Sequence, residues 1–232
     1  TAQRKIAHVL VNARLNACSL AKRRWGRWIY RALLPGFSAI WVQNEESGLG
    51  LMALGADASQ INITGNIKNF APPIGCDPVE LQAWQQALGK RPTWVLASSH
   101  PGEETLALSA HEQVLHQRQD ALLIIAPRAP ARGPDVAKQC PKGAALRSAK
   151  DAVSAETSVY VADTIGDMGL WYRLAPIALM GGSFAEVGGH NPHEPLALGC
   201  HVLHGPNVWN FAESYAELDA KGHSLQVSTS SI

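Results

Sequence analysis

Residues 181–195 read Gly-Gly-Ser-Phe-Ala-Glu-Val-Gly-Gly-His-Asn-Pro-His-Glu-Pro, and they follow a short apolar run at Ile177–Met180. Glycines let the backbone turn sharply and approach a ligand closely. Asn191 and Glu194 place polar groups where the carboxyl end of a strand meets the start of a helix, and phosphates and sugars bind at such places in α/β proteins. The stretch therefore predicts a ligand-binding loop at the edge of an α/β sheet.

Along the rest of the chain, short apolar runs alternate with helix-like stretches. The predicted strands are Ala7–Val11, Ser38–Val42, Ile61–Thr64, Thr93–Ser98, Leu122–Ala126, Val159–Ala162 and Ile177–Met180. The predicted helices are Leu20–Leu34, Glu45–Leu54, Pro78–Leu88, Glu103–Gln117 and Asp167–Leu174. We expect Asp77 to cap the third helix, with Glu80 as its capping-box partner. This alternation predicts parallel sheets of the Rossmann-like kind.

A break between two domains is expected at residues 72–76. The stretch Ala71–Cys76 has no hydrophobic periodicity and contains two adjacent prolines, as is typical of a linker. We therefore predict domains at residues 1–71 and 77–232. The chain has 232 residues, 46% of them hydrophobic, which is enough for two modest cores. Residues 129–158 carry little pattern, so a loop-rich surface excursion is expected there.

The charge of the chain is unevenly distributed. Residues 1–44 contain eight of the 20 Lys and Arg and no acidic residue, whereas the remainder holds 12 basic against 19 acidic residues. Within Leu20–Leu34, apolar residues at helical spacing lie among five basic ones, and the apolar set is Trp25, Trp28, Ile29, Ala32 and Leu33. Such a helix either packs its apolar stripe on its own sheet or lies against an anionic membrane surface. Nucleic acid is not an expected partner, because no nucleic-acid-binding signature is present.

Two further features bear on the class of protein. No run of 18 apolar residues occurs, so the sequence predicts no membrane-spanning helix. The chain does not begin with Met, so we expect a fragment of a longer protein. Four widely separated cysteines without a CxxC pair are interpreted as reduced, cytosolic thiols.

Four polar clusters fall at predicted strand ends, where doubly wound sheets bind ligands. They are Ser98-Ser99-His100, Pro127-Arg128, residues 163–167 and residues 181–194. Arg128 suits a phosphate, peptide N–H groups around Gly166 suit an anion, and Asn191 with Glu194 suits sugar hydroxyls. Taken singly, each has a plainer interpretation: a surface arginine, a turn, or a helix cap.

Other kinds of site fit the sequence less well. Ser99 and His100 are adjacent, but no GxSxG elbow surrounds the serine. The histidines at 190, 193, 201 and 204 do not match a known metal-ligand spacing, so we interpret them as loop histidines and predict no metal site. Neither a Walker loop nor a GxGxxG fingerprint is present.

As an ordered set, these motifs resemble the 3-deoxy-D-manno-octulosonic acid (Kdo) transferases. The segments that carry the resemblance are Thr-Gly-Asn-Ile-Lys at 64–68, Ser-Ser-His-Pro-Gly-Glu-Glu at 98–104, Pro-Arg at 127–128, Asp-Thr-Ile-Gly-Asp at 163–167, Gly-Gly-His-Asn-Pro-His-Glu at 188–194 and Gly-Pro-Asn-Val-Trp-Asn-Phe at 205–211. The resemblance implies a GT-B fold and inverting transfer of Kdo from CMP-Kdo to a lipid A precursor, lipid IVA, without a catalytic metal or cofactor. It also implies a location at the cytoplasmic face of the bacterial inner membrane.

The resemblance further assigns roles to the domains and to single residues. Residues 1–71 correspond to the latter part of the acceptor-side domain and residues 77–232 to an incomplete donor domain. The CMP contacts carried over by position are Pro127, Arg128, Ile165, Gly166, Asp167, Asn191, Pro192, His193 and Glu194. Lys68 matches the lysine that stabilises the transition state. The family's general base has no counterpart in this chain.

Three positions depart from the family pattern. Ala129 and Ala131 replace a histidine and a glutamate, and Asp167 stands where glutamate is common. These changes affect the predicted donor contacts. Two alternatives stay open beside the transferase: a nucleotide- or lipid-binding module without turnover, which the absent base favours, and a GT-B sugar-nucleotide epimerase, against which the order of the motifs argues.

Overall fold

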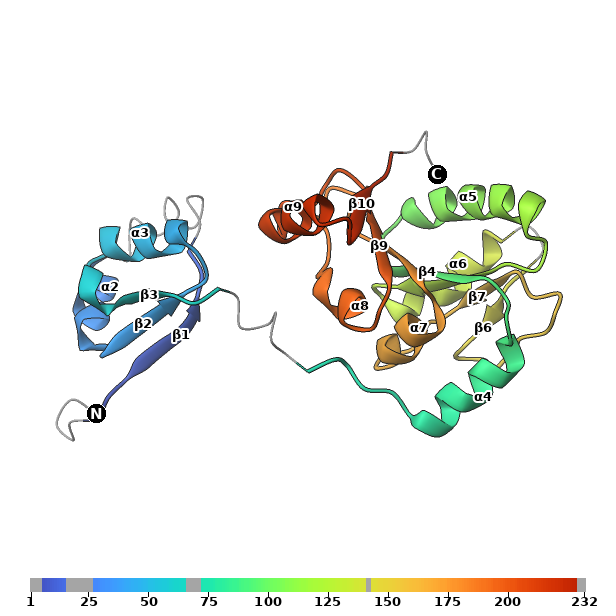
Figure 1. Ribbon diagram of the computed structural model, residues 1–232, viewed down its shortest axis with the longest axis horizontal. Coiled ribbons are helices and arrows are strands. Elements are labelled where there is room, and N and C mark those ends of the chain that lie inside the picture. The colour runs from blue at the N-terminus through green and yellow to red at the C-terminus, as the bar shows by residue number, and fades with distance from the viewer. Residues whose placement is uncertain (1–5, 16–26, 66–71, 141–142, 229–232) are drawn as a thin grey trace. The chain divides into compact units, whose positions relative to one another are not determined.

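A parallel sheet forms the centre of each of the two units into which the chain divides, Thr1–Pro72 and Pro73–Ile232 (Figure 1). The computed structural model describes residues 6–15, 27–65, 72–140 and 143–228. In the first unit the parallel strands pair in the order β1 (Val9–Ala13), β2 (Ala39–Val42) and β3 (Ile61–Ile63). The helical elements of this unit are α2 (Arg27–Leu33), η3 (Leu34–Gly36), α3 (Glu45–Ala53) and η4 (Ala58–Gln60).

The core of the first unit is small. Ile40 and Val42 of β2 are fully buried and pack with Leu34, Leu51 and Leu54. Helix α3 begins because the side chain of its N-cap residue, Asn44, accepts a hydrogen bond from the N–H of Ser47 (3.0 Å).

Helix α2 covers the described part of the predicted helix up to Leu33, one residue before the predicted end. Trp28, Ile29 and Leu33 are 71%, 42% and 60% exposed, so the first of the two interpretations, an apolar stripe packed on the sheet of this unit, is wrong for these residues. Tyr30 and Leu34 contact the core instead. The rest of the predicted helix, including Trp25, lies in residues 16–26, outside the described part of the chain.

In the second unit, seven parallel strands pair in the order β10-β9-β8-β4-β5-β7-β6. Their bounds are β4 (Thr93–Ser99), β5 (Leu122–Pro127), β6 (Ala145–Leu146), β7 (Val159–Val161), β8 (Ile177–Met180), β9 (His201–His204) and β10 (Ser224–Gln226). The chain runs from β4 outward through β5, then returns to place β8 on the other side of β4. This reversal makes the sheet doubly wound and puts its switch point between β4 and β8.

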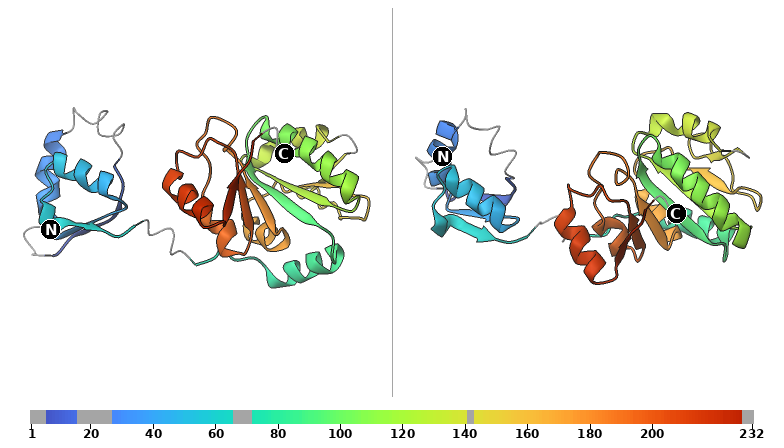
Figure 2. Two further views of the ribbon diagram at one scale, coloured as in Figure 1. Left: turned by 45° about the horizontal axis from the view of Figure 1, so that its top comes forward. Right: turned by 90° about the horizontal axis from the view of Figure 1, so that it is seen from above.

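Helices cover both faces of this sheet (Figures 1 and 2). They are α4 (Pro78–Leu88), α5 (Glu103–Gln117), α6 (Gly133–Lys138), α7 (Met168–Leu174), α8 (His193–Ala197) and α9 (Ala212–Ala220), with a 3₁₀ turn at η6 (Pro130–Arg132). Successive strand residues alternate between the faces: Val95 packs with α4, α7 and α9, whereas its neighbour Leu96 packs with α5 and α6. Because both faces are covered, the central strand β5 is apolar throughout, as is common in parallel sheets.

Two local predictions for the second unit need correction. Asp77 caps α4 by accepting from the N–H of Val79 (2.8 Å), but Glu80 pairs with Arg147 rather than closing a capping box. The stretch 129–158 contains η6, α6 and β6, and α6 buries Val136 completely, so it is more than a surface excursion.

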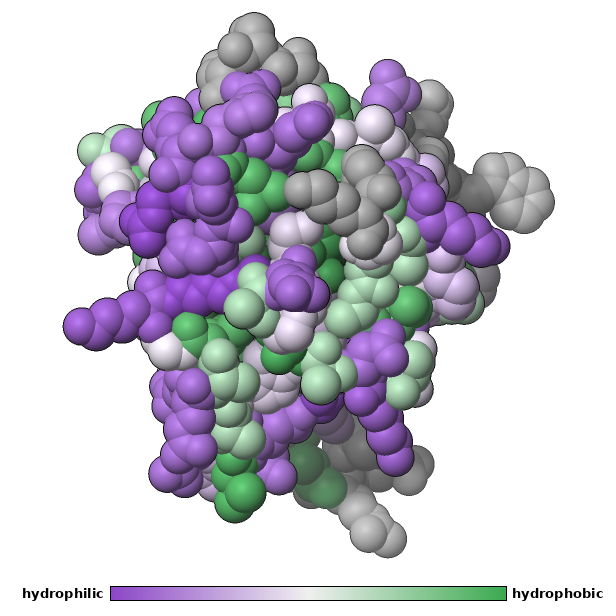
Figure 3. All heavy atoms as spheres, turned by 90° about the vertical axis from the view of Figure 1, so that its right-hand side faces the viewer, coloured by the Kyte–Doolittle hydropathy of each residue, from purple (hydrophilic) through white to green (hydrophobic). Residues whose placement is uncertain are grey.

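Seen from one side (Figure 3), the surface consists mostly of hydrophilic residues, which surround small hydrophobic areas.

Candidate functional site

The carboxyl ends of β4 and β8 approach each other unusually closely at the switch point. A Cβ atom at Gly181 would lie 2.3 Å from the carbonyl oxygen of Ser98, a distance that only glycine tolerates. Ser98 itself has a φ of 57°, so the chain turns sharply where β4 ends. Open α/β sheets bind ligands in the crevice outside such strand ends.

The buried carboxylate of Glu103, the first residue of α5, joins the two loops at this point. It accepts hydrogen bonds from the backbone N–H groups of His100 (2.9 Å), Gly182 (2.8 Å) and Phe184 (2.9 Å). Glu103 is 2% exposed, so these bonds form away from solvent. The sequence places Glu103 within a motif but does not reveal this role, because two of its partners, Gly182 and Phe184, lie 79 and 81 residues away.

Two histidines meet across the same switch point. The Nε2 atoms of His100 and His190 lie 3.0 Å apart, and the two rings stack with an interplanar angle of 15°. Burial, together with electrostatic repulsion from neighbouring His100 and Arg128, lowers the pKa of His190 below its usual value, although Glu103 opposes the shift. A hydrogen bond between the rings requires one nitrogen to be unprotonated.

Pro127 and Arg128 lie at the end of β5, next to this pair. The N–H of Arg128 donates to the carbonyl of Ser99 (3.0 Å), and its side chain is exposed. Within the described residues, the guanidinium has neither a hydrogen bond nor an ion pair, and its charge acts on His190. A free guanidinium beside strand ends is well suited to bind a phosphate.

The second predicted loop, Asp163–Asp167, follows β7. Gly166 has a φ of +98°, and the side chain of Ile165 is 88% exposed. The carboxylate of Asp167 does not point freely into solvent, because Thr164 donates to its Oδ2 and Arg147 Nε lies 3.2 Å from the same atom. Asp167 was predicted as a CMP contact, and its side chain is already engaged within the protein.

The third predicted loop, Asn191–Glu194, runs into α8. Asn191 Oδ1 accepts from the N–H of His193 (3.1 Å), and its Nδ2 donates to Glu194 Oε1 (3.3 Å). Pro192 is buried and Glu194 is exposed. His193 Nε2 lies 3.0 Å from Ser214 Oγ, and burial lowers the pKa of His193, opposed by Glu217. Asn191 thus shapes the loop, whereas Glu194 remains accessible.

All three predicted loops lie at the carboxyl edge of one parallel sheet, and Arg128 and His190 are within electrostatic reach of each other. Lys68 belongs to residues 66–71, outside the described part of the chain. The interpretation of four histidines as loop residues is wrong for three of them: His193 begins α8, and His201 and His204 are the first and last residues of β9. His204 Nε2 lies 3.2 Å from Asp219 Oδ2. No group of His, Cys, Asp and Glu suited to hold a metal occurs in the part of the chain that the structure describes.

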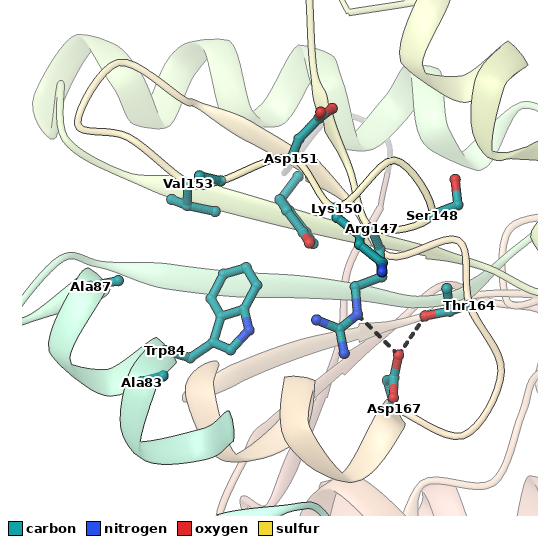
Figure 4. A pocket seen from close by; sticks show the side chains of 12 residues that line it. Ala83, Trp84, Ala87, Arg147, Ser148, Lys150, Asp151, Val153, Thr164 and Asp167 are labelled. Carbon is teal, nitrogen blue, oxygen red and sulfur yellow. Dashed lines mark hydrogen bonds and ion pairs between the residues drawn. The ribbon is translucent and has the colours of Figure 1, made fainter. Parts of the chain in front are cut away.

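A cavity of about 660 Å³ borders the second loop (Figure 4). Trp84 of α4 and Val153 line its apolar side, and Arg147, Thr164 and Asp167 line the side toward the loop. Arg147 and Ser148 contact this loop directly, yet they come from the stretch in which the sequence showed little pattern.

The described cysteines and helices bear on two further predictions. Cys76, Cys140 and Cys200 are free thiols, and Cys18 lies outside the described residues. Burial raises the pKa of Cys140 and of Cys200 to about 11. Among the described residues, no helix has the length and apolar character needed to cross a membrane.

Comparison with solved structures supports the fold. The chain is similar to the C-terminal CMP-Kdo binding domain of WaaA from Acinetobacter baumannii, with a TM-score of 0.61 and 31% identity over 64% of this chain and 80% of that one. A UDP-GlcNAc 2-epimerase from Neisseria meningitidis matches 98% of this chain and 58% of its own with a TM-score of 0.59, but at 15% identity it shows the fold alone. The predicted α/β, GT-B-like fold class is confirmed.

Comparison of sequences identifies the family. Residues 1–71 match the family described as 3-deoxy-D-manno-octulosonic-acid transferase (kdotransferase). The 3-deoxy-D-manno-octulosonic acid transferase of Haemophilus influenzae is 34% identical over 222 residues, 93% of this chain and 51% of that protein. The transferase of Bordetella pertussis is 32% identical over 94% of this chain and 52% of its own length. The chain therefore spans about half the length of these curated relatives, and it belongs to the 3-deoxy-D-manno-octulosonic acid transferase family.

Proposed function

We propose that this chain supplies the donor-binding part of a glycosyltransferase that moves Kdo from CMP-Kdo to a lipid A precursor, lipid IVA. The observation that carries the proposal is the 31% identity of the chain to a CMP-Kdo binding domain, of which it covers 80%. The free guanidinium of Arg128 and the exposed carboxylate of Glu194 at the same sheet edge support it chemically.

The phosphate and the ribose of the nucleotide each have a suitable partner in this proposal. Arg128 binds the phosphate by charge-assisted hydrogen bonds, and the backbone around Ile165 and Gly166 adds N–H donors. Glu194, oriented by Asn191, accepts hydrogen bonds from ribose hydroxyls. As the bond from Kdo to the phosphate breaks, Arg128 and Lys68 stabilise the negative charge that develops on CMP, and the configuration at the sugar carbon inverts.

The remaining roles of the proposed enzyme follow from the family. A general base that activates the acceptor hydroxyl is not among the residues of this chain that match the family, so we expect this chain to bind the donor without turning it over. The basic N-terminal segment and the exposed Trp28, Ile29 and Leu33 suit contact with the cytoplasmic face of the inner membrane, where the lipid acceptor resides.

Calorimetric titration of CMP into the 232-residue chain tests the proposal. We expect saturable binding that falls at least tenfold in Arg128→Ala and in Glu194→Ala, because each substitution removes a charged hydrogen-bonding group. Arg118→Ala is the matched control, since Arg118 is also an exposed arginine but follows the C-terminus of α5, near the amino edge of the sheet. A folded protein that does not bind CMP, or equal losses in the control, would contradict the proposal.

The two alternatives predict different results. A UDP-sugar epimerase would bind UDP in preference to CMP, so the same titration with UDP separates it from the transferase. A non-catalytic binding module would also bind CMP. It would not restore Kdo transfer, however, when the chain is mixed with the part of a family member that it does not cover.

A further inference from the structure

Two adjacent residues hold both ends of the loop Asp163–Asp167. Ser148 donates to Asp163 through its backbone N–H (2.8 Å) and through its hydroxyl (2.6 Å). Arg147 Nε lies 3.2 Å from Asp167 Oδ2 at the other end. We call this pair the Arg147–Ser148 clasp; one short segment thereby fixes a five-residue loop at its first and last positions.

The first end of the loop has almost no freedom to move. Asp163 is 7% exposed, and a Cβ atom added at Gly133 would lie 2.3 Å from its Cβ. Both carboxylate oxygens of Asp163 are bonded to Ser148. Asp163 is therefore a fixed anchor for the loop and is not available to a ligand.

The second end is held through a charge. Arg147 pairs with Glu80 of α4 as well as with Asp167, and its guanidinium lies 5.5 Å from the ring centroid of Trp171. Figure 4 shows Arg147 between Trp84 and Asp167, with Thr164 on the far side of that carboxylate. The hydrogen bond to Glu80, together with the charge of Asp167, raises the pKa of Arg147 against the effect of burial. The guanidinium of Arg147 thus keeps its positive charge.

Between these ends, the backbone is left to face a ligand. Gly166 has a positive φ, and among the described residues no hydrogen bond from the N–H of Ile165 or Gly166 is found. An unpaired carboxylate at Asp167 would repel a phosphate bound there, whereas one neutralised by Arg147 does not.

We propose that Arg147 and Ser148 are positioning residues for the nucleotide: they fix Thr164–Gly166 so that the backbone N–H groups bind CMP. In this arrangement Asp167 acts on the nucleotide through the loop rather than by contact. The inference rests on the proposed function, because the ligand of the loop is the CMP of the donor.

Calorimetry with CMP on the 232-residue chain tests the clasp. We expect Arg147→Met to weaken binding about tenfold and Arg147→Lys to restore part of the loss, since a charge-assisted bond to Asp167 is removed and then partly replaced. If Asp167 acts only through the loop, Arg147→Met will cost much less in an Asp167→Asn background than alone. Additive losses would overturn this coupling.

The control variant is Glu80→Gln, which removes the other partner of Arg147 without touching the loop. We expect it to lower thermal stability while leaving CMP affinity within about twofold, the scatter ordinary for a site without direct coupling. Equal losses of CMP affinity in Glu80→Gln and Arg147→Met would assign Arg147 to holding α4 and would overturn the inference.

A measurement without ligand separates this inference from the proposed function. Amide hydrogen exchange of Ile165 and Gly166, followed by NMR, should become faster or the resonances broader in Arg147→Met and Ser148→Ala while the central strands stay protected. If the wild type binds CMP and the variants bind it equally well, the positioning role of the Arg147–Ser148 clasp is contradicted while the proposed function stands. If the wild type does not bind CMP, the proposed function fails together with the role of the clasp in nucleotide binding.

Discussion

The carboxylate of Glu103 accepts a hydrogen bond from the backbone N–H of Gly182 at 2.8 Å, although the two residues are 79 positions apart. Because the same carboxylate also bonds to His100 and Phe184, the loops after β4 and β8 are held as one body. A single buried side chain therefore bridges the two loops that form the switch point.

Replacing this side chain by its neutral isostere should be costly. Glu103→Gln keeps one oxygen but removes charge and acceptor capacity, so we expect the free energy of unfolding to fall by about 1–3 kcal/mol. Urea denaturation followed by circular dichroism measures the change. Glu112→Gln, an exposed position in the same helix α5, is the control and should fall within experimental error of the wild type. Equal stability of both variants would show that Glu103 is not the connecting group.

The close approach of Gly181 to Ser98 gives a steric prediction. In Gly181→Ala the new methyl group would lie 2.3 Å from a carbonyl oxygen in the rigid centre of the sheet, so we expect a loss of about 3 kcal/mol or more. Thermal unfolding compares it with Gly75→Ala, where an added Cβ meets nothing within 4 Å. A Gly181→Ala protein as stable as that control would mean that β4 and β8 separate readily.

Arg132 neutralises a carboxylate that has no access to water. Glu104 has a fully buried side chain, and its Oε1 accepts from Arg132 Nη1 (2.7 Å) and from Ser99 Oγ (2.6 Å). Arg132→Met leaves that charge uncompensated, so we expect a loss of about 3–5 kcal/mol in chemical denaturation. Adding Glu104→Gln to Arg132→Met should recover part of the loss, and a double variant less stable than the single one would contradict this account.

Buried histidines predict lower stability in acid. Burial lowers the pKa of His111 below its usual 6.5, with Arg91 acting in the same direction and the bond to Ser158 opposing. Trp94 Nε1 lies 3.1 Å from His111 Nδ1 and must donate to it, which requires a neutral ring. The unfolded chain therefore binds more protons between the folded pKa and 6.5, and stability is lost as pH falls through this window. The pKa values of His190 and His193 are shifted in the same direction.

Thermal melting between pH 7.5 and 5 checks this dependence. His111→Phe should be less stable than the wild type at pH 7.5 but should lose less stability on acidification, because it cannot bind the proton. His223→Gln, at an exposed position, is the control and should keep the wild-type slope. An unchanged slope in His111→Phe would show that His111 does not contribute.

The main elements of the second unit could be predicted from sequence because their signals are local. Helix α5 lies at its predicted bounds, Glu103–Gln117, since Gly102 with a φ of +94° stops the preceding turn and acidic residues open the helix. Strand β8 likewise occupies Ile177–Met180 as predicted. A short apolar run flanked by turn residues was enough to predict the bounds of this strand.

What the sequence did not reveal depends on residues distant in the chain. The roles of Glu103 and Arg147 arise from partners brought together only by the sheet, and the short strand β6, which precedes Arg147, gives no periodic signal. The exposure of Trp28 could not be decided from the sequence, because helical spacing locates an apolar stripe without saying what covers it.

The position of β4 at the centre of its sheet also governs when the site can exist during folding. Trp94 of β4 pairs with Ile177 of β8, so the two walls of the crevice are separated by most of the second unit along the chain. Topologies dominated by such distant contacts fold slowly, since long loops must close before their pairing is rewarded. The proposed donor recognition is thus a property of the completed sheet: a nascent chain that has emerged only as far as α7 already carries Arg128 and Gly166 but has no crevice in which to use them.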